Sequence, residues 1–123
     1  MDKKILIVED EVALREALRD KFQREDFIII EASNGEEGLK KAIDEEPDLI
    51  LLDIIMPKMD GFTMVQKLRE AEKDKGVEEA KIPVIFLTNV DEEKGMSPGQ
   101  QLGVYDYLVK SDWGLKDIVK KLI

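Results

Sequence analysis

The sequence predicts an α/β fold in which a doubly wound parallel sheet carries helices on both faces. Short apolar runs rich in Ile, Val and Leu have the length of strands that are buried on both sides of a sheet. Segments whose apolar residues recur at helical spacing lie between these runs. Strands that alternate with helices form βαβ units, which build parallel sheets. The runs that we interpret as strands are residues 5–8, 27–30, 49–52, 84–87 and 105–109.

In the N-terminal half, each apolar run is followed by one amphipathic stripe. The stripe after residues 5–8 has apolar residues four positions apart, which predicts a helix: Leu14, Leu18 and Phe22. After the run at 27–30, the pair Asn34-Gly35 predicts a turn. The second stripe, which Pro47 closes, consists of Gly38, Leu39, Ala42 and Ile43.

The C-terminal half continues the alternation. The run at 49–52 ends at Asp53, and a third helical stripe follows with Met64, Val65 and Leu68. We interpret the charged stretch 70–81 as a solvated helix end and loop. A closing helix is predicted by the apolar residues Leu115, Ile118, Val119 and Leu122. Five strands in this arrangement suit the order 2-1-3-4-5.

The composition limits the chemistry that is open to the chain. Its 123 residues suit a single domain, residues 1–123, without an output domain. The 19 basic and 28 acidic residues give a net charge of −9, which argues against direct binding of nucleic acid or an anionic membrane. Cysteine and histidine are both absent, which excludes disulfides, zinc–thiolate sites, Ser–His catalysis and a phosphohistidine. Neither a membrane span nor a secretory signal is visible, so we expect a cytoplasmic protein.

Polar residues follow four of the predicted strands. They are Glu9 and Asp10 after the first strand, Asp53 after the third, Thr88 after the fourth and Lys110 after the fifth. In the order 2-1-3-4-5 these strand ends are neighbours, and such sheets bind ligands where the order reverses, between the first and third strands. We therefore expect Glu9, Asp10 and Asp53 to converge on one pocket, with Thr88 and Lys110 on its rim.

These residue types favour phosphoryl chemistry. Three carboxylates in one pocket repel each other, and a hard divalent cation such as Mg²⁺ would compensate for their charge. Asp53 would then attack phosphorus as a nucleophile, while Lys110 and the Thr88 hydroxyl contact phosphoryl oxygens. Each residue also has an ordinary explanation: acidic residues suit a helix start, Asp53 a turn, Thr88 a cap and Lys110 the surface. Only the functional interpretation predicts that all of them meet at one edge of the sheet.

Four segments at predicted strand ends follow one another along the chain. They are ILIVEDE at 5–11, LLDIIMPKMDG at 51–61, LT at 87–88 and YDYLVK at 105–110. Together they resemble the receiver domain of two-component response regulators, the family of the bacterial chemotaxis protein CheY. The resemblance covers essentially the whole chain.

The resemblance implies a role for each acidic residue of the predicted pocket. Asp53 would be the phosphoacceptor. Asp10, Asp53 and the carbonyl of Ile55 would bind Mg²⁺, and Glu9 would assist through a water molecule. In this family the positions of Ile55 and Val90 influence how easily water reaches the phosphoryl group. Because both are apolar here, we expect a phosphorylated form that loses its phosphate slowly.

The resemblance also implies a switch and its partners. Thr88 and Lys110 would contact the phosphoryl group, and Tyr107 matches the switch aromatic that moves together with Thr88 on phosphorylation. The phosphoryl donor would be a sensor histidine kinase or a phosphotransfer protein. The protein would signal by contact with a downstream protein that the sequence does not name, as a monomer or weak dimer. It would not be a turnover enzyme.

The sequence departs from the family pattern in four places. Asn89 stands where a small residue is usual, and Ser111 stands where the family has a proline that follows a cis bond. The stretch 91–103 contains residues that would break or shorten the family's fourth helix, namely Gly95, Pro98 and Gly99. The segment 70–81 is longer than the family norm.

Three other functions compete with this interpretation. A degenerate receiver would bind partners without phosphorylation, which the departures at Asn89, Ser111 and 91–103 favour. A haloacid-dehalogenase-like phosphatase also uses a strand-end Asp with Mg²⁺, but it needs a second Asp at the position of Ile55. A flavodoxin-like flavin carrier needs a hydroxyl- and glycine-rich phosphate loop after the first strand, where this chain has acidic residues that repel phosphate.

Overall fold

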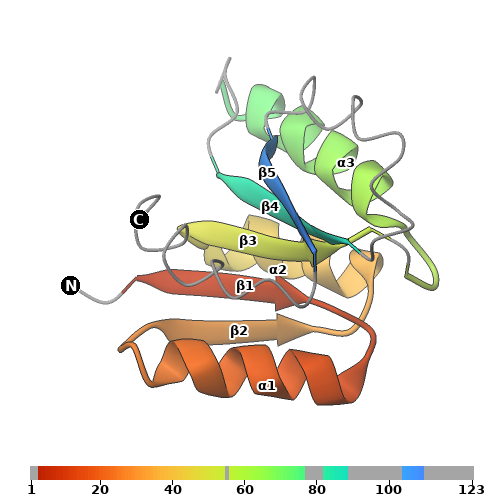
Figure 1. The fold of residues 1–123 in the computed structure, drawn as a ribbon. Coiled ribbons are helices and arrows are strands. Elements are labelled where there is room, and N and C mark those ends of the chain that lie inside the picture. The colour runs from red at the N-terminus through yellow and green to blue at the C-terminus, as the bar shows by residue number, and fades with distance from the viewer. Residues whose placement is uncertain (1–2, 55, 77–81, 89–103, 110–123) are drawn as a thin grey trace.

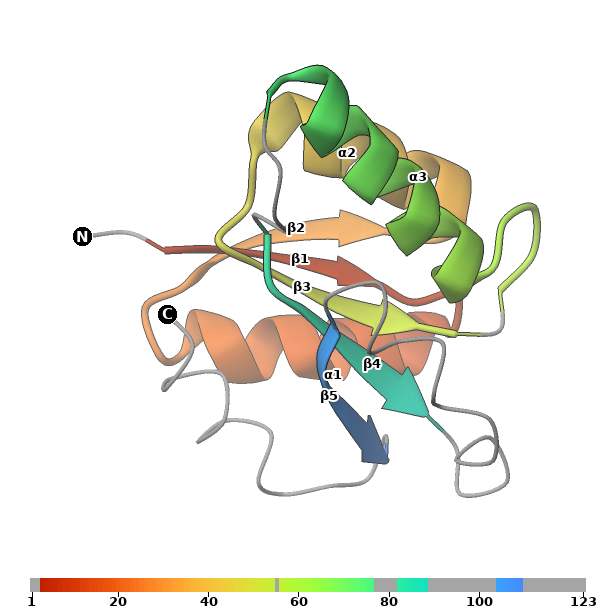
Figure 2. The ribbon, with the colours of Figure 1, turned by 90° about the horizontal axis from the view of Figure 1, so that it is seen from above.

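The computed structural model of the chain describes residues 3–54, 56–76, 82–88 and 104–109, of which 88 and 104–109 are described by their backbone alone. The elements are β1 (Lys4–Val8), α1 (Val12–Gln23), β2 (Ile28–Ala32), α2 (Gly35–Glu45), β3 (Leu49–Asp53), α3 (Gly61–Asp74), β4 (Val84–Thr88) and β5 (Val104–Val109). The strands pair in parallel in the order β2-β1-β3-β4-β5. Helix α1 covers one face of the sheet, and α2 and α3 cover the other (Figures 1 and 2). The predicted doubly wound parallel fold is confirmed.

Some predictions fall on parts of the chain that the structure does not describe. They include the closing helix at 115–122 and the departures from the family pattern at Asn89, Ser111 and 91–103. Among the helices that are described, none is long and apolar enough to cross a membrane.

The central strands are buried on both faces, which explains why their apolar runs are continuous. In β1, Leu6 and Val8 pack into the core beneath α2 and α3. Ile5 and Ile7, which alternate with them, pack into the second core beneath α1. All four side chains are 0% exposed. The prediction that the run at 5–8 forms a strand buried on both faces is therefore confirmed, and the third strand at 49–52 is buried in the same way.

Polar contacts hold both ends of β1. At its start, the Lys4 amide donates to Asp48 Oδ2 at 2.8 Å, and the Asp48 amide donates to the Lys4 carbonyl at 2.8 Å. Just beyond its end, the Glu9 amide donates to the Ala32 carbonyl of β2 at 3.1 Å. These bonds set the position of β1 relative to its two neighbouring strands.

The pair Asn34-Gly35 begins a helix and is not the turn that the sequence predicts. Asn34 is the N-cap of α2, and its side-chain oxygen accepts a hydrogen bond from the Glu37 amide at 2.9 Å. Gly35 is the first helical residue, and a Cβ atom there would lie 2.2 Å from the Met59 carbonyl oxygen. Glycine is required at this position because the start of α2 packs directly against the loop that follows β3.

Within the charged stretch 70–81, the described residues 70–76 are mostly exposed, as expected for a solvated helix end, and Glu72 is the exception. Helix α3 ends in this stretch at Asp74, and Glu72 is buried with 6% of its surface exposed. Arg69 Nη1 donates to Glu72 Oε1 at 2.8 Å, and the Ile82 amide donates to Glu72 Oε2 at 3.0 Å. Glu72 thus links the C-terminal half of α3 to the segment that enters β4.

We expect Glu72→Ala to lower the free energy of unfolding by about 3 kcal/mol, because it leaves the Arg69 charge and the Ile82 amide buried without this carboxylate. The measurement is urea denaturation followed by far-UV circular dichroism. The matched control is Glu70→Ala, an exposed residue of the same helix, which should change stability by less than about 0.5 kcal/mol. An equal decrease in the free energy of unfolding in both variants would contradict a structural role of the Arg69–Glu72 pair.

Candidate functional site

The carboxyl ends of β1 and β3 bring three carboxylates together. In the sheet register Val8 pairs with Leu52, so the residues that follow Val8 lie beside Asp53. Carboxylate oxygens of Glu9, Asp10 and Asp53 all lie within 4.8 Å of one another. Glu9 is 0% exposed and Asp53 is 1% exposed, whereas Asp10 is exposed. The sequence-predicted cluster is therefore present in the folded chain.

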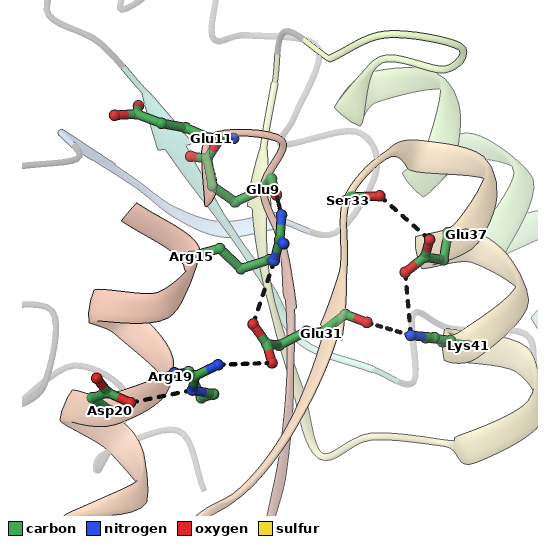
Figure 3. Close-up of polar contacts among 9 residues, drawn as sticks. All are labelled: Glu9, Glu11, Arg15, Arg19, Asp20, Glu31, Ser33, Glu37 and Lys41. Atoms are coloured by element: carbon green, nitrogen blue, oxygen red, sulfur yellow. Dashed lines mark hydrogen bonds and ion pairs between the residues drawn. The ribbon is translucent and has the colours of Figure 1, made fainter. Parts of the chain in front are cut away.

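The backbone around Glu9 is held from several directions. Its amide donates to Ala32, and its carbonyl accepts a hydrogen bond from Arg15 Nη1 of α1 at 2.8 Å (Figure 3). Its side chain is also engaged, because Oε2 accepts the Glu11 amide at 3.1 Å. The connection from β1 to α1 thus has a fixed conformation at the point where it carries the acidic residues.

The connection after Asp53 is anchored in a similar way. The Gly61 amide, at the start of α3, donates to the Ile54 carbonyl at 2.7 Å. A Cβ atom at Gly61 would lie only 2.5 Å from the Asp53 carbonyl oxygen. Asp60 caps the same helix, because its Oδ1 accepts the Thr63 amide at 2.8 Å. Gly61 therefore allows α3 to begin directly against the acidic strand end.

The donor set fits a hard divalent cation. Carboxylate oxygens are the ligands that Mg²⁺ prefers, and it is commonly held by one or two of them together with water. Like charges at this separation repel, and burial of two of the three carboxylates strengthens that repulsion because water screens it less. Glu9, Asp10 and Asp53 together could hold a metal ion.

The remaining predicted site residues are placed only in part. Thr88 ends β4, next to Leu87, which pairs with Asp53. Its backbone therefore lies at the same edge of the sheet as the acidic cluster. Tyr107 lies in β5, where its backbone pairs with that of Phe86 in β4. The side chains of Thr88 and Tyr107, and all of Ile55 and Lys110, lie outside the described part of the chain.

Sequence reasoning missed two residues that shape this site. Arg15 lies in α1, and nothing local in the sequence signals its contact with Glu9 or with Glu31 at the end of β2. Gly61 is the last residue of the matching segment 51–61, but its close approach to the Asp53 carbonyl depends on how α3 packs. A Gly directly after a helix-capping Asp is the signal that could have identified this tight start.

Comparisons with known proteins agree with the fold. The family model of the response regulator receiver domain matches residues 5–123. The alkaline phosphatase synthesis transcriptional regulatory protein PhoP of Bacillus subtilis is 41% identical over 110 residues, which are 89% of this chain and 43% of that protein. The transcriptional regulatory protein ResD of the same organism is 38% identical over 109 residues, 89% of this chain and 42% of that protein. The chain thus spans less than half the length of these curated relatives.

Solved structures show the same relationship. The response regulator TrrA of Thermotoga maritima, in complex with Mg²⁺-BeF, superposes with a TM-score of 0.82 at 36% identity, and covers 98% of this chain and 99% of its own. The chemotaxis protein CheY4 of Vibrio cholerae gives a TM-score of 0.85 at 26% identity over 100% of both chains. The fold, the matching segments and these relatives lead to one conclusion: the chain belongs to the family of response regulator receiver domains, which are signalling domains of two-component systems.

Proposed function

We propose that this chain is a phosphorylation-dependent switch that accepts a phosphoryl group on Asp53. The observation that carries the proposal is the position of the Asp53 carboxylate, which is 1% exposed at the end of a central strand and lies within 4.8 Å of two further carboxylates. Repulsion among these carboxylates destabilises the metal-free fold, and a bound cation that also receives a phosphoryl group would offset it.

In this proposal Mg²⁺ is held by Asp10, Asp53 and the Ile55 carbonyl, and Glu9 assists through a water molecule. When bound, Mg²⁺ would offset the charge of the carboxylates and shield the incoming phosphoryl oxygens from them. The complex of the related TrrA protein with Mg²⁺-BeF supports this assignment. The anchored backbones of Glu9 and Ile54 support it too, because they keep both acidic strand ends in place.

The transfer itself is a displacement at phosphorus. A carboxylate oxygen of Asp53 forms a bond to the phosphorus of a partner's phosphohistidine, and the P–N bond of that residue breaks. The histidine nitrogen keeps the electron pair and takes up a proton. Thr88 and Lys110 would contact the phosphoryl oxygens. The donor histidine lies outside these 123 residues, which contain no histidine, and would belong to a sensor histidine kinase or a phosphotransfer protein.

The output in this proposal is a protein contact. Thr88 and Tyr107 would move together after phosphorylation and change the surface beside β5, which a downstream protein then recognises. The curated relatives are named transcriptional regulatory proteins, and this chain spans 43% and 42% of the first two. We assign no DNA contact to this chain itself, because its net charge is −9. We also propose that residues 1–123 form one domain and that the protein is located in the cytoplasm.

Two alternative functions have less support than the phosphorylation-dependent switch. A phosphatase of the haloacid-dehalogenase type would turn over substrate, but Ile55 occupies the position of its general acid. A degenerate receiver would need no phosphorylation, and the preserved cluster of Glu9, Asp10 and Asp53 argues against it. We therefore assign this chain a role as a switch that modifies itself, and no turnover activity.

We expect incubation with a small-molecule phosphodonor and Mg²⁺ to add one phosphoryl group, which intact mass spectrometry would detect. The addition should disappear in EDTA and in the variant Asp53→Asn. The control is Asp44→Asn, an exposed carboxylate on α2, which should be modified as fully as the parent protein. Unmodified parent protein that still binds Mg²⁺ would instead favour the degenerate receiver.

We also expect the phosphorylated protein to lose its phosphate slowly, because the apolar residues Ile55 and Val90 occupy positions that in this family influence access of water. The measurement is decay of the phosphorylated mass in excess Mg²⁺ after removal of the donor. Substitution of Val90 by Glu or Asn should change the decay rate while the Asp44→Asn control decays as the parent does. Decay of the parent within seconds would show that these two side chains do not limit hydrolysis.

A further inference from the structure

One arginine connects helix α1 to the backbone of the acidic cluster. Arg15 Nη1 donates to the Glu9 carbonyl at 2.8 Å, and its Nε donates to Glu31 Oε1 at 3.3 Å (Figure 3). The Arg15 side chain is only 16% exposed, so these contacts are partly shielded from water. A single guanidinium thus joins the end of β1 to the end of β2.

We propose that Arg15 is a positioning residue for the Mg²⁺ site, an inference that rests on the function proposed above. Arg15 does not act as a ligand in this proposal. It acts through the peptide that joins Glu9 to Asp10, because the Glu9 carbonyl and the Asp10 amide belong to the same planar unit. A hydrogen bond that fixes the direction of this carbonyl also fixes the orientation of the backbone from which the Asp10 side chain departs.

Asp10 needs this support more than the other two acidic residues. Glu9 is 0% exposed and Asp53 is 1% exposed, so packing already restricts their rotamers. Asp10 is exposed, and packing gives it no such restriction. The orientation of its backbone is therefore the main means by which the fold can aim the Asp10 carboxylate at the cation.

Glu31, the second partner of Arg15, is itself held by other residues. Arg19 Nη1 contacts Glu31 Oε2 at 3.4 Å, and Lys41 of α2 donates to the Glu31 carbonyl. Lys41 also pairs with Glu37 Oε1 at 3.2 Å. Partial burial raises the pKa of the Glu37 carboxyl, but the hydrogen bond and charge of Lys41, together with Ser33, outweigh burial and keep that pKa below its usual value. Glu31 is therefore a well-positioned partner for the Arg15 guanidinium.

A purely structural role for Arg15 would have different consequences. Ion pairs as exposed as those of Glu31, whose side chain is 31% exposed, contribute little to stability. Arg19 offers a matched comparison, because it lies on the same helix and pairs with the same Glu31 but makes no contact with Glu9. Loss of Arg19 removes its ion pairs with Glu31 and Asp20, and loss of Arg15 removes the ion pair with Glu31 together with the bond to the Glu9 carbonyl.

The test compares Arg15→Met with Arg19→Met, which both keep an unbranched apolar stem and remove the guanidinium donors. Isothermal titration with MgCl₂ should show an increase of about tenfold in the dissociation constant for Arg15→Met, in line with the effect of other outer-shell partners of metal sites. Arg19→Met should bind Mg²⁺ as the parent does. At saturating Mg²⁺ the rate of Asp53 phosphorylation by a small-molecule donor should be the same in all three proteins.

Two further measurements separate positioning from stability. Thermal unfolding in EDTA should give similar midpoints for Arg15→Met and Arg19→Met. The variant Arg15→Lys, which keeps the charge but has a single donor nitrogen that cannot span both acceptors, should recover part of the lost Mg²⁺ affinity. Recovery by Lys, together with an unchanged rate at saturating Mg²⁺, is the pattern expected of a residue that orients a ligand.

The outcomes are distinguishable. Parent protein that fails to bind Mg²⁺ would overturn both the proposed function and this inference. Parent protein that binds Mg²⁺ with an affinity that Arg15→Met leaves unchanged would overturn the inference alone. Equal losses of Mg²⁺ affinity in Arg15→Met and Arg19→Met, in step with lower unfolding midpoints, would also overturn it and reduce Arg15 to a structural residue.

Discussion

Electrostatic repulsion among three carboxylates is the constraint on which the rest of this structure depends. Glu9, Asp10 and Asp53 lie within 4.8 Å of one another, and two of them are almost completely buried. In water such groups would move apart, but here they are attached to adjacent parallel strands whose side chains fill two cores. The packing of β1 and β3 therefore maintains a local arrangement that is unfavourable by itself and becomes favourable when positive charge is added.

Both acidic strand ends are secured by the helix that follows them. After β1, the Glu9 carbonyl accepts from Arg15 of α1. After β3, the Ile54 carbonyl accepts from the Gly61 amide at the start of α3. One bond comes from a side chain and the other from the backbone, but each restrains the first peptide groups beyond the strand. The two helices lie on opposite faces of the sheet, so the cluster is held from both sides (Figure 2).

Local patterns in the sequence predicted the strands, and the strand order typical of such sheets predicted that the acidic residues after the first and third strands meet. Continuous apolar runs require burial on both faces, and Asp53 follows directly from the end of such a run. Asn34-Gly35 was misassigned as a turn because the same pair suits a turn and a helix start. In the folded chain the Glu37 amide donates to the Asn34 side chain, which is the hydrogen bond of a helix N-cap.

The contacts that the sequence did not predict are long-range. Glu72 stands in a charged stretch and is buried because the Ile82 amide, ten residues further along the chain, meets its carboxylate. Arg15 resembles any charged residue of an amphipathic helix, and its role arises because β2 places Glu31 within reach. Spacing along one helix contains no information about such partners, which depend on the folded arrangement of the sheet.

The burial of β1 on both faces has a consequence for its alignment in the sheet. In a strand with one polar face, a slip of one residue would expose apolar side chains to water, and this penalty selects the correct pairing. In β1 a slip would only exchange Leu6 and Val8 with Ile5 and Ile7 between two apolar cores. The polar residues at the two ends of β1 must then discriminate, because a slip would move the charged side chain of Lys4 or Glu9 into a position that an apolar residue occupies in one of the cores. The acidic end of the strand thus helps to define the correct fold as well as the site.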